Sequence, residues 1–253
     1  MKQLSVIIPV YNGEEYVETC VTSILRQKNI DRSDIEIIII NDGSTDSSFD
    51  VVKKYELEYP GLIRLIDQRN QGAAISRNEG IKLAKGKYVT LIDQDDWIDE
   101  DYLNTLLMAI QKGNYDVLQS GFKLVDNNNI IGKVVPVKTR FGQLLAIPAW
   151  AKIYRTDFLR VNSIYFFDNN IGEDNVFTLK VYLYAETYGS IDYCGYNNYY
   201  SNSESVTNTL HKGLSPKVRF IRLLDELEIV GSSFDQDRQI LEYNILRTCG
   251  YYL

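Results

Sequence analysis

The chain has 253 residues, of which 45% are apolar and 24% are charged. This balance excludes a disordered, collagenous or coiled-coil protein. The 27 basic and 34 acidic residues give a net charge of −7 without any block of Lys and Arg, so we expect no nucleic-acid partner. Three widely spaced cysteines, no signal-peptide pattern and no long apolar run predict a soluble cytoplasmic protein without a thiolate metal site.

The first hundred residues alternate strand and helix signals. Their strand signals are continuous apolar runs, which are typical of strands buried on both faces of a parallel, doubly wound sheet. We therefore expect the α/β class, with a mixed, mostly parallel sheet flanked by helices. The predicted elements are strand 4–10, helix 14–28, strand 35–40, a helix that follows Ser44-Thr45-Asp46 and reaches Tyr59, strand 62–66, helix 71–85 and strand 88–92.

The pattern loosens after residue 100. An Asp126-Asn127-Asn128-Asn129 turn signal between two apolar runs predicts a hairpin that adds antiparallel strands to the sheet. The last helical pattern breaks off without a cap, so we expect a C-terminal extension that is cut short. The predicted elements here are helix 100–112, strands 116–125 and 130–137, and helices 174–185, 214–230 and 236–248.

Polar residues follow three of the predicted parallel strands at the point where each strand ends. These segments are Tyr11-Asn12, Asn41-Asp42-Gly43-Ser44 and Asp93-Gln94-Asp95-Asp96. Ligands of open α/β sheets bind outside the carboxyl ends of the strands. The sequence therefore predicts a binding site at this edge.

The densest acidic group is formed by Asp93, Asp95 and Asp96. Carboxylates so close together repel one another unless a cation neutralises them, and Mg²⁺ or Mn²⁺ held by one or two carboxylates completes its shell with substrate phosphate. The alternative is a solvated turn that caps the helix starting near Asp99. A second acidic residue at a neighbouring strand end, Asp42, favours the metal interpretation.

Several phosphate-binding classes lack their motifs. No GxGxxG follows the first strand and no GxxxxGK[ST] occurs, so neither a dinucleotide nor a P-loop site is supported. A nucleotidyltransferase would need a Gly-rich basic loop after the first strand, where Glu14-Glu15 stands instead.

Five motifs in order over residues 4–97 together resemble the family 2 glycosyltransferases, which have the GT-A fold. The quoted segments are Val6-Ile7-Ile8-Pro9-Val10-Tyr11-Asn12, Asn41-Asp42-Gly43-Ser44-Thr45-Asp46, Asn70-Gln71-Gly72, Arg77-Asn78-Glu79-Gly80 with Gly86-Lys87-Tyr88, and Asp93-Gln94-Asp95-Asp96-Trp97. Beyond residue 140 the resemblance is carried by Ala149-Trp150-Ala151-Lys152-Ile153-Tyr154-Arg155 and Gly172-Glu173-Asp174.

The resemblance implies which residues contact the donor nucleotide. Asp42 would accept a hydrogen bond from a nucleobase N–H, unless it only caps a turn. Arg77 would face the nucleotide or diphosphate, and its alternative is an ion pair with the acidic cluster. The donor-contacting set is Pro9, Tyr11, Asn12, Asp42, Asn70, Arg77 and Asp93.

The resemblance also implies a metal site for Mn²⁺ or Mg²⁺. Asp95 would bind the metal directly, Asp93 would reach the ribose or the metal, and Asp96 would support or cap the motif. His211, the single histidine, is either a third metal ligand or an ordinary surface residue. The basic residue of related loops is missing at Tyr199-Tyr200-Ser201, which leaves Lys152 and Lys212 as candidates for that charge.

Asp174 is the candidate general base, because a carboxylate can take the proton of an acceptor hydroxyl during attack on the anomeric carbon. The helix dipole favours the ionised form of a carboxylate at the N-terminus of a helix, where Asp174 is expected. The alternative is that Glu173 and Asp174 merely decorate the first helical turn.

The implied function is inverting transfer of a sugar from a nucleoside-diphosphate sugar, with UDP as the expected nucleotide, to a glycan or lipid-linked saccharide. The alternative is a non-catalytic GT-A module that binds a nucleotide or glycan in a polysaccharide assembly. We expect a domain over 1–212, with a donor half at 1–98 and an acceptor half at 99–212, and a helical extension at 213–253. Peripheral association with membrane-bound assembly machinery at the inner membrane face fits this function, and the sequence leaves the oligomeric state open.

Overall fold

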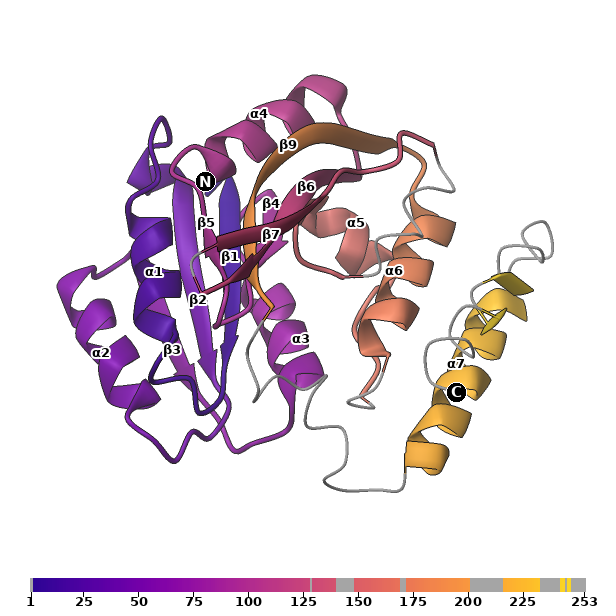
Figure 1. The fold of residues 1–253 in the computed structure, drawn as a ribbon, viewed down its shortest axis with the longest axis horizontal. Coiled ribbons are helices and arrows are strands. Elements are labelled where there is room, and N and C mark those ends of the chain that lie inside the picture. Colours follow the sequence, from indigo (N-terminus) through magenta and orange to yellow (C-terminus); the bar gives the residue numbers. More distant parts are fainter. Residues whose placement is uncertain are drawn as a thin grey trace.

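The computed structural model describes residues 2–127, 129–139, 148–168, 172–200, 216–232, 242–243 and 245–246. Helices cover both faces of a curled sheet, and the N-terminus and the last helix lie on opposite sides of the molecule (Figure 1). The elements are β1 (Leu4–Val10), α1 (Val17–Leu25), a 3-10 turn (Arg32–Asp34), β2 (Ile35–Asn41), α2 (Ser48–Glu58), β3 (Ile63–Asp67), α3 (Ala73–Leu83), β4 (Tyr88–Leu91), β5 (Trp97–Ile98), α4 (Tyr102–Gly113), β6 (Val117–Asp126), β7 (Asn129–Val134), β8 (Lys152–Arg155), α5 (Thr156–Val161), α6 (Glu173–Tyr184), β9 (Tyr188–Tyr199) and α7 (Pro216–Ser232).

The sheet has two parts with different strand directions. Strands run in the order β3-β2-β1-β4-β8-β6-β9-β5, and β7 pairs with β6 outside this path. The first four strands are mutually parallel, whereas β8 is antiparallel to both of its neighbours, β4 and β6. The parallel part carries the strand ends that the sequence marks as a site.

The parallel strands are buried on both faces because helices cover each side. Leu4, Val6 and Ile8 point into a core shared with α1 and α4. Ile7 points the other way, into a core shared with α3, α5 and α6. Burial of both faces explains why β1 and β2 read as largely apolar runs; near their starts they are interrupted by Ser5 and Glu36, which are hydrogen-bonded to each other at 2.6 Å.

The last described helix adds a separate layer. Leu223, Leu227 and Val230 of α7 pack on Val176 and Leu179 of α6, and Figure 1 shows α7 beside α6, away from the sheet. In the part of the chain that the structure describes, no helix is both long enough and apolar enough to cross a bilayer.

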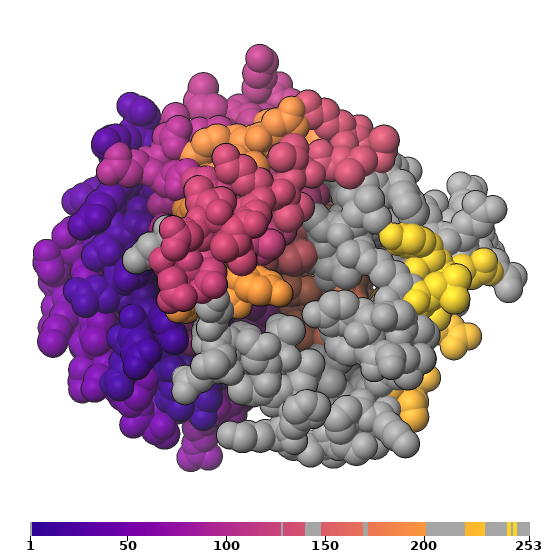
Figure 2. Space-filling model, in the orientation of Figure 1, coloured from indigo at the N-terminus to yellow at the C-terminus, as the bar shows by residue number. Residues whose placement is uncertain are grey.

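The predicted elements of the first half are confirmed, with boundaries shifted by a few residues. The helix predicted from residue 14 begins at Val17, and the helix predicted to follow Asp46 begins at Ser48. The hairpin is confirmed as β6 and β7, and in the space-filling view its residues cover part of the front face beside β9 (Figure 2). The helix predicted over 236–248 falls almost wholly outside the described residues.

Three strands were not predicted. Strands β5 and β8 have only two and four residues, so they carry too little periodicity to be read from sequence. Strand β9 is absent from the predicted elements, yet it pairs with β6 over most of its twelve residues. The burial pattern of β9 is mixed, and its pairing with β6 shifts register beside Gly121. The strand therefore lacks the regular alternation that marks a strand in sequence.

Replacing Gly80 with Ala tests the packing of α3 on the sheet. Ala favours helix over Gly by up to about 1 kcal/mol, but a methyl group here would overlap the buried Ile7 side chain of β1. We expect overpacking to dominate, with a net loss of about 1–3 kcal/mol in unfolding free energy. Urea denaturation of Gly80→Ala measures it, with Lys82→Ala on the exposed face of α3 as control; a Gly80→Ala chain as stable as the parent would contradict this packing.

Candidate active site

Side chains tie the carboxyl ends of the parallel strands to one another. The backbone N–H of Tyr11, after β1, donates to Gln94 Oε1 at 2.9 Å, and Gln94 Nε2 donates back to the Tyr11 carbonyl at 3.0 Å. Asn12 Oδ1 accepts from the backbone N–H of Thr45, after β2, at 2.8 Å. Asn12 itself has a left-handed φ of 46°, which Asn tolerates better than most residues. The ends of β1, β2 and β4 thus form one continuous rim.

Pro9 and Tyr11 lie at this rim in different settings. Pro9 is buried in β1. The pairing of β1 with β4 ends at Ile7, so the missing N–H of Pro9 costs no hydrogen bond to β4. The Tyr11 side chain is 45% exposed. It is therefore free to cover a ligand seated on the rim.

Asp42 is buried at the end of β2 with its carboxylate satisfied by protein donors. Oδ1 accepts from Gln68 Nε2 at 2.7 Å and from the backbone N–H of Gln71 at 2.9 Å, and Oδ2 accepts from the N–H of Gly72 at 2.7 Å. These donors belong to the loop between β3 and α3. The contacts of Asp42 among the described residues therefore fix a distant loop and do not cap its own turn, and its predicted contact with a nucleobase stays a prediction.

The same loop presents Asn70 at the surface. Gly43, with a φ of +70°, lets the loop approach so closely that a Cβ there would lie 2.8 Å from the backbone nitrogen of Asn70. Asn70 is exposed. Asp42 and Gly43 together hold Asn70 on the rim, which keeps it available for a ligand.

Arg77 is the centre of the site. Its side chain is 9% exposed, and Nη2 donates to Asp93 Oδ1 at 2.8 Å. Nη1 lies 3.7 Å from Glu173 Oε1 and 3.9 Å from Asp174 Oδ1. Burial alone lowers the pKa of Arg77, but the neighbouring carboxylates, led by Asp93, more than offset this and raise its pKa above the usual value. The predicted ion pair with the acidic cluster is therefore present.

Asp174 occupies the first turn of α6, as predicted. Its side chain is 25% exposed, yet Oδ1 is enclosed and has no hydrogen-bond partner among the described residues. Oδ2 accepts from the backbone N–H of Ala149 at 3.3 Å. Burial raises the pKa of Asp174 to about 6 against the opposing guanidinium of Arg77, with Glu173 and Asp93 adding to the rise. A carboxylate with such a pKa can accept a proton near neutral pH.

The acidic motif after β4 has two half-buried carboxylates and one that is fully buried. Asp93 and Asp95 are half-buried at the rim. Asp96 is 1% exposed and accepts from Tyr196 Oη at 2.6 Å and from the backbone N–H of Tyr199 at 2.8 Å. Burial, with the nearby Asp95 and Asp93 charges, raises the pKa of Asp96. Asp96 thus fixes the motif to β9, in agreement with its predicted supporting role.

Two partly exposed carboxylates at a strand end fit a magnesium-type site of the kind that substrate phosphate completes. Among the described residues, no group of three or more His, Cys, Asp and Glu could hold a metal by itself. His211 lies outside the described residues. Lys152, a candidate for the missing basic charge, is 4% exposed and donates to the carbonyl of Pro148, and burial lowers its pKa to about 7.

Sequence reasoning missed several residues that build this site. Gln68 carries no motif signal, whereas Gln94 lies inside the quoted acidic motif, although no role was assigned to it. Phe166 lies under Arg77, with the guanidinium carbon 5.3 Å from the ring centroid, and Asn78 holds the Phe166 backbone through two hydrogen bonds of 2.9 and 2.7 Å. Asn78 also belongs to a quoted motif, so membership of the motifs was the available signal for Gln94 and Asn78.

Replacing Arg77 with Met should expose the electrostatic balance of the site. Removing one partner of a buried ion pair is destabilising, and we expect about 3 kcal/mol because the carboxylates keep some contact with water. Without the cation that opposes it, the pKa of Asp174, already raised to about 6, rises further, so the folded variant binds more protons near neutrality than the parent does. The stability deficit should therefore be largest near pH 7 and shrink as the pH falls toward ~5.

Urea denaturation of Arg77→Met at several pH values measures this deficit. Arg26→Met, at the exposed residue that follows α1, is the matched control and should stay within about 0.5 kcal/mol of the parent. A deficit that grows on acidification would show that the carboxylates do not depend on Arg77.

Comparison with known proteins identifies the family. Residues 5–157 match the model described as Glycosyl transferase family 2. The chain is 33% identical over 205 residues to glycosyltransferase GlyA of Streptococcus pneumoniae serotype 4, covering 73% of this chain and 28% of GlyA. It is 27% identical over 268 residues to the poly(ribitol-phosphate) beta-N-acetylglucosaminyltransferase TarS of Staphylococcus aureus strain MW2, covering 100% of this chain and 46% of TarS.

The fold agrees with a solved relative. A crystal structure of S. aureus TarS 1-349 in complex with UDP aligns with a TM-score of 0.69 at 26% identity, covering 92% of this chain and 73% of that one. The chain spans less than half the length of the two curated relatives, GlyA and TarS. By its family match and its curled α/β sheet, the chain belongs to glycosyltransferase family 2 and has the GT-A fold.

Proposed function

We propose that this chain transfers a sugar from a UDP-sugar to a hydroxyl group of a glycan or lipid-linked saccharide, with inversion at the anomeric carbon. The observation that carries the proposal is the position of Arg77. It contacts Asp93, in the acidic motif after β4, and lies within 4 Å of Asp174, on α6. The group expected to bind the donor and the group expected to activate the acceptor therefore meet at one edge of the sheet.

The rim of strand ends supplies the donor site. Tyr11 is exposed for contact with the base or ribose, and Asn12, Asn70 and Asp93 surround the same edge. Asp42 holds the loop that carries Asn70, and its Oδ2, which accepts from the N–H of Gly72, is the atom proposed to accept from a nucleobase N–H as well. The UDP complex of TarS, at 26% identity, supports UDP as the nucleotide.

A divalent cation, Mn²⁺ or Mg²⁺, fits the exposed carboxylates of the acidic motif. Asp95 and Asp93 would hold it, with His211 as the proposed third ligand. When bound, such a cation neutralises negative charge on the departing diphosphate. The chain carries a net charge of −7, so an anionic donor would otherwise meet electrostatic repulsion at this rim.

Asp174 is the proposed general base. Its carboxylate would take the proton from the acceptor hydroxyl while the hydroxyl oxygen attacks the anomeric carbon and the bond to the diphosphate breaks. Arg77 opposes the rise of the Asp174 pKa and so keeps the base ionised near neutral pH. Ala149 fixes Oδ2, which leaves Oδ1 for the proton.

The remaining parts of the proposal concern the rest of the protein. Residues 1–98 would bind the donor, 99–212 would bind the acceptor and supply the base, and 213–253 would form a helical extension. TarS is described as acting on poly(ribitol-phosphate), which supports an acceptor in surface-polymer synthesis, beside membrane-bound assembly machinery. The alternative is a non-catalytic GT-A module that binds a nucleotide or glycan. Such a module would bind a UDP-sugar but would not cleave it to release UDP.

Binding of UDP tests the metal. UDP with Mn²⁺ or Mg²⁺ at ~100 times its dissociation constant should add about 2.7 kcal/mol of stability, a rise of roughly 5–10 °C in Tm for a chain of this size. UDP with EDTA should give a much smaller rise. Asp95→Asn should lose the metal-dependent part, whereas Asp157→Asn, an exposed acid on α5, should retain it. Equal shifts with and without chelator would remove the metal from the proposal.

Replacing Asp174 with Asn tests catalysis separately from donor binding. Asn keeps the size of the side chain, so UDP–Mn²⁺ stabilisation should persist while kcat falls by about 10²–10⁴. The parent enzyme should lose kcat/KM as the pH falls through about 6, because the base must be ionised and its pKa is raised to that value. Turnover is measured as UDP release from UDP-sugars with saccharide acceptors; a variant with near-normal turnover would eliminate Asp174 as the base.

A further inference from the structure

A cavity separate from the rim lies on the flank of the molecule, between α1 and the segment that runs from β5 into α4. Its volume is about 630 Å³, within the range of small-molecule sites. One wall comes from α1 and the residues after it, and the other from the five residues that follow the acidic motif. The lining includes Thr19, Thr22, Arg26, Asn29, Trp97 and Asp101.

Hydrogen bonds fix the two walls against each other. The N–H of Ile98 donates to Ser23 Oγ at 3.2 Å, and the N–H of Lys28 donates to the Glu100 carbonyl at 2.6 Å. Gln27 donates to the Asp99 carbonyl at 2.7 Å and accepts from the N–H of Leu103 at 2.8 Å. The cleft is therefore built before any ligand arrives, which reduces the entropic cost of binding.

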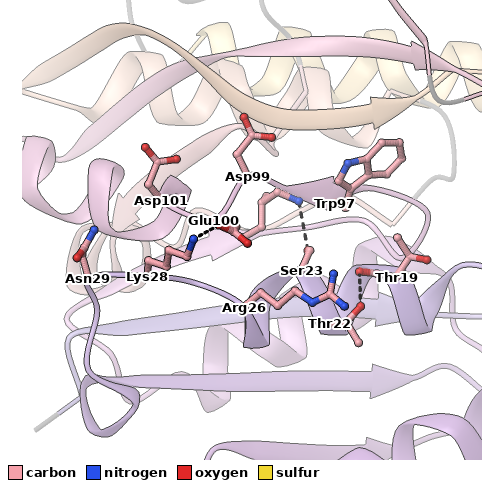
Figure 3. Close-up of a pocket in the computed structure, with 11 residues that line it drawn as sticks. Thr19, Thr22, Ser23, Arg26, Lys28, Asn29, Trp97, Asp99, Glu100 and Asp101 are labelled. Carbon is pink, nitrogen blue, oxygen red and sulfur yellow. Dashed lines mark hydrogen bonds and ion pairs between the residues drawn. The ribbon is translucent and has the colours of Figure 1, made fainter.

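Its two ends differ in chemistry. Figure 3 shows the Lys28–Glu100 ion pair across the cleft, with Asn29 and Asp101 toward one end and Trp97 toward the other, and with Arg26 and Thr22 on the α1 side. Trp97 is only half-buried and offers an indole face and an N–H. Arg26 is exposed, so its guanidinium is accessible as a hydrogen-bond donor.

The charges of the lining balance, which favours a neutral ligand. Asp99 is paired with Lys123 and Glu100 with Lys28, so the remaining charges of the lining are one cation, Arg26, and one carboxylate, Asp101. The cleft therefore has no net charge that would attract an anion or a cation. A neutral ligand with many hydroxyl groups meets both donors and acceptors, since each hydroxyl can do both, while its apolar C–H face can lie on the indole.

We propose that this cleft is a saccharide-binding site for neutral hexose units, separate from the rim where sugar transfer is proposed. Trp97 supplies the stacking face, and Arg26, Asn29 and Asp101 supply hydrogen bonds to the sugar hydroxyls. The cleft begins two residues after Asp95, so a glycan held there would have one end near the acidic motif. Binding to the cleft itself needs no donor and does not depend on the transfer reaction.

Titration calorimetry with maltotriose, cellotriose and chitotriose, without UDP or metal, tests the site. At least one trisaccharide should bind saturably, and saturation-transfer NMR should show contact with the sugar C–H protons. Thr22→Arg, which fills the cleft from the α1 wall, should weaken binding about tenfold or more. Val161→Arg, an equally long side chain at a position 82% exposed on α5, should leave it unchanged.

Trp97 separates stacking from folding. Trp97→Leu should weaken binding about tenfold, and Trp97→Phe, which keeps an aromatic face, should restore most of it. UDP–Mn²⁺ stabilisation of Thr22→Arg at the parental level shows that the donor site is intact. No binding by any of the three trisaccharides, binding that survives both Thr22→Arg and Trp97→Leu, or tighter binding of a uronic trisaccharide would overturn the proposal.

Discussion

One buried cation, Arg77, holds the site together. Three carboxylates lie within 4 Å of its guanidinium. Asp93 comes from one segment of the chain, and Glu173 and Asp174 come from another, about 80 residues later. Carboxylates brought so close would repel one another at neutral pH. Because the guanidinium remains charged at any physiological pH, the segments that carry Asp93 and Asp174 can approach without protonation.

The environment of Arg77 is built for an enclosed cation. Phe166 covers one side of the guanidinium, and Phe166 in turn stacks on Phe177 of α6 with ring centroids 4.0 Å apart. Asn78, next to Arg77 on α3, holds the Phe166 backbone. Helix α3 thus places the cation and also the segment that shields it, so the ion pairs are screened little by water.

The rim around this centre is a network of loops rather than of strands. Gln94 joins β4 to β1, Asn12 joins β1 to β2, Asp42 joins β2 to the loop before α3, and Asp96 joins the acidic motif to β9. Each link pairs a side-chain oxygen with a backbone N–H of a neighbouring segment, so that a polar backbone group is satisfied. The rigid sheet therefore positions loop side chains that a flexible loop could not hold alone.

The sequence by itself determined the parallel half of the fold and the edge where the site lies. The largely apolar runs from Leu4 and from Ile35 indicate strands that are buried on both faces, and polar residues follow where these strands end. These are local signals with a short period, so they survive in a single sequence. The position of Asp174 at a helix start followed from equally local features.

Only the tertiary structure decided which of these residues touch. Arg77 meets Asp174 across 97 positions of sequence, and Asp96 meets Tyr199 across 103; no periodicity encodes such pairs. The strand β9 was hidden because its faces are neither uniformly apolar nor regularly alternating. The flank cleft likewise arises from two walls that are about 70 residues apart in the chain, and packing alone brings them together.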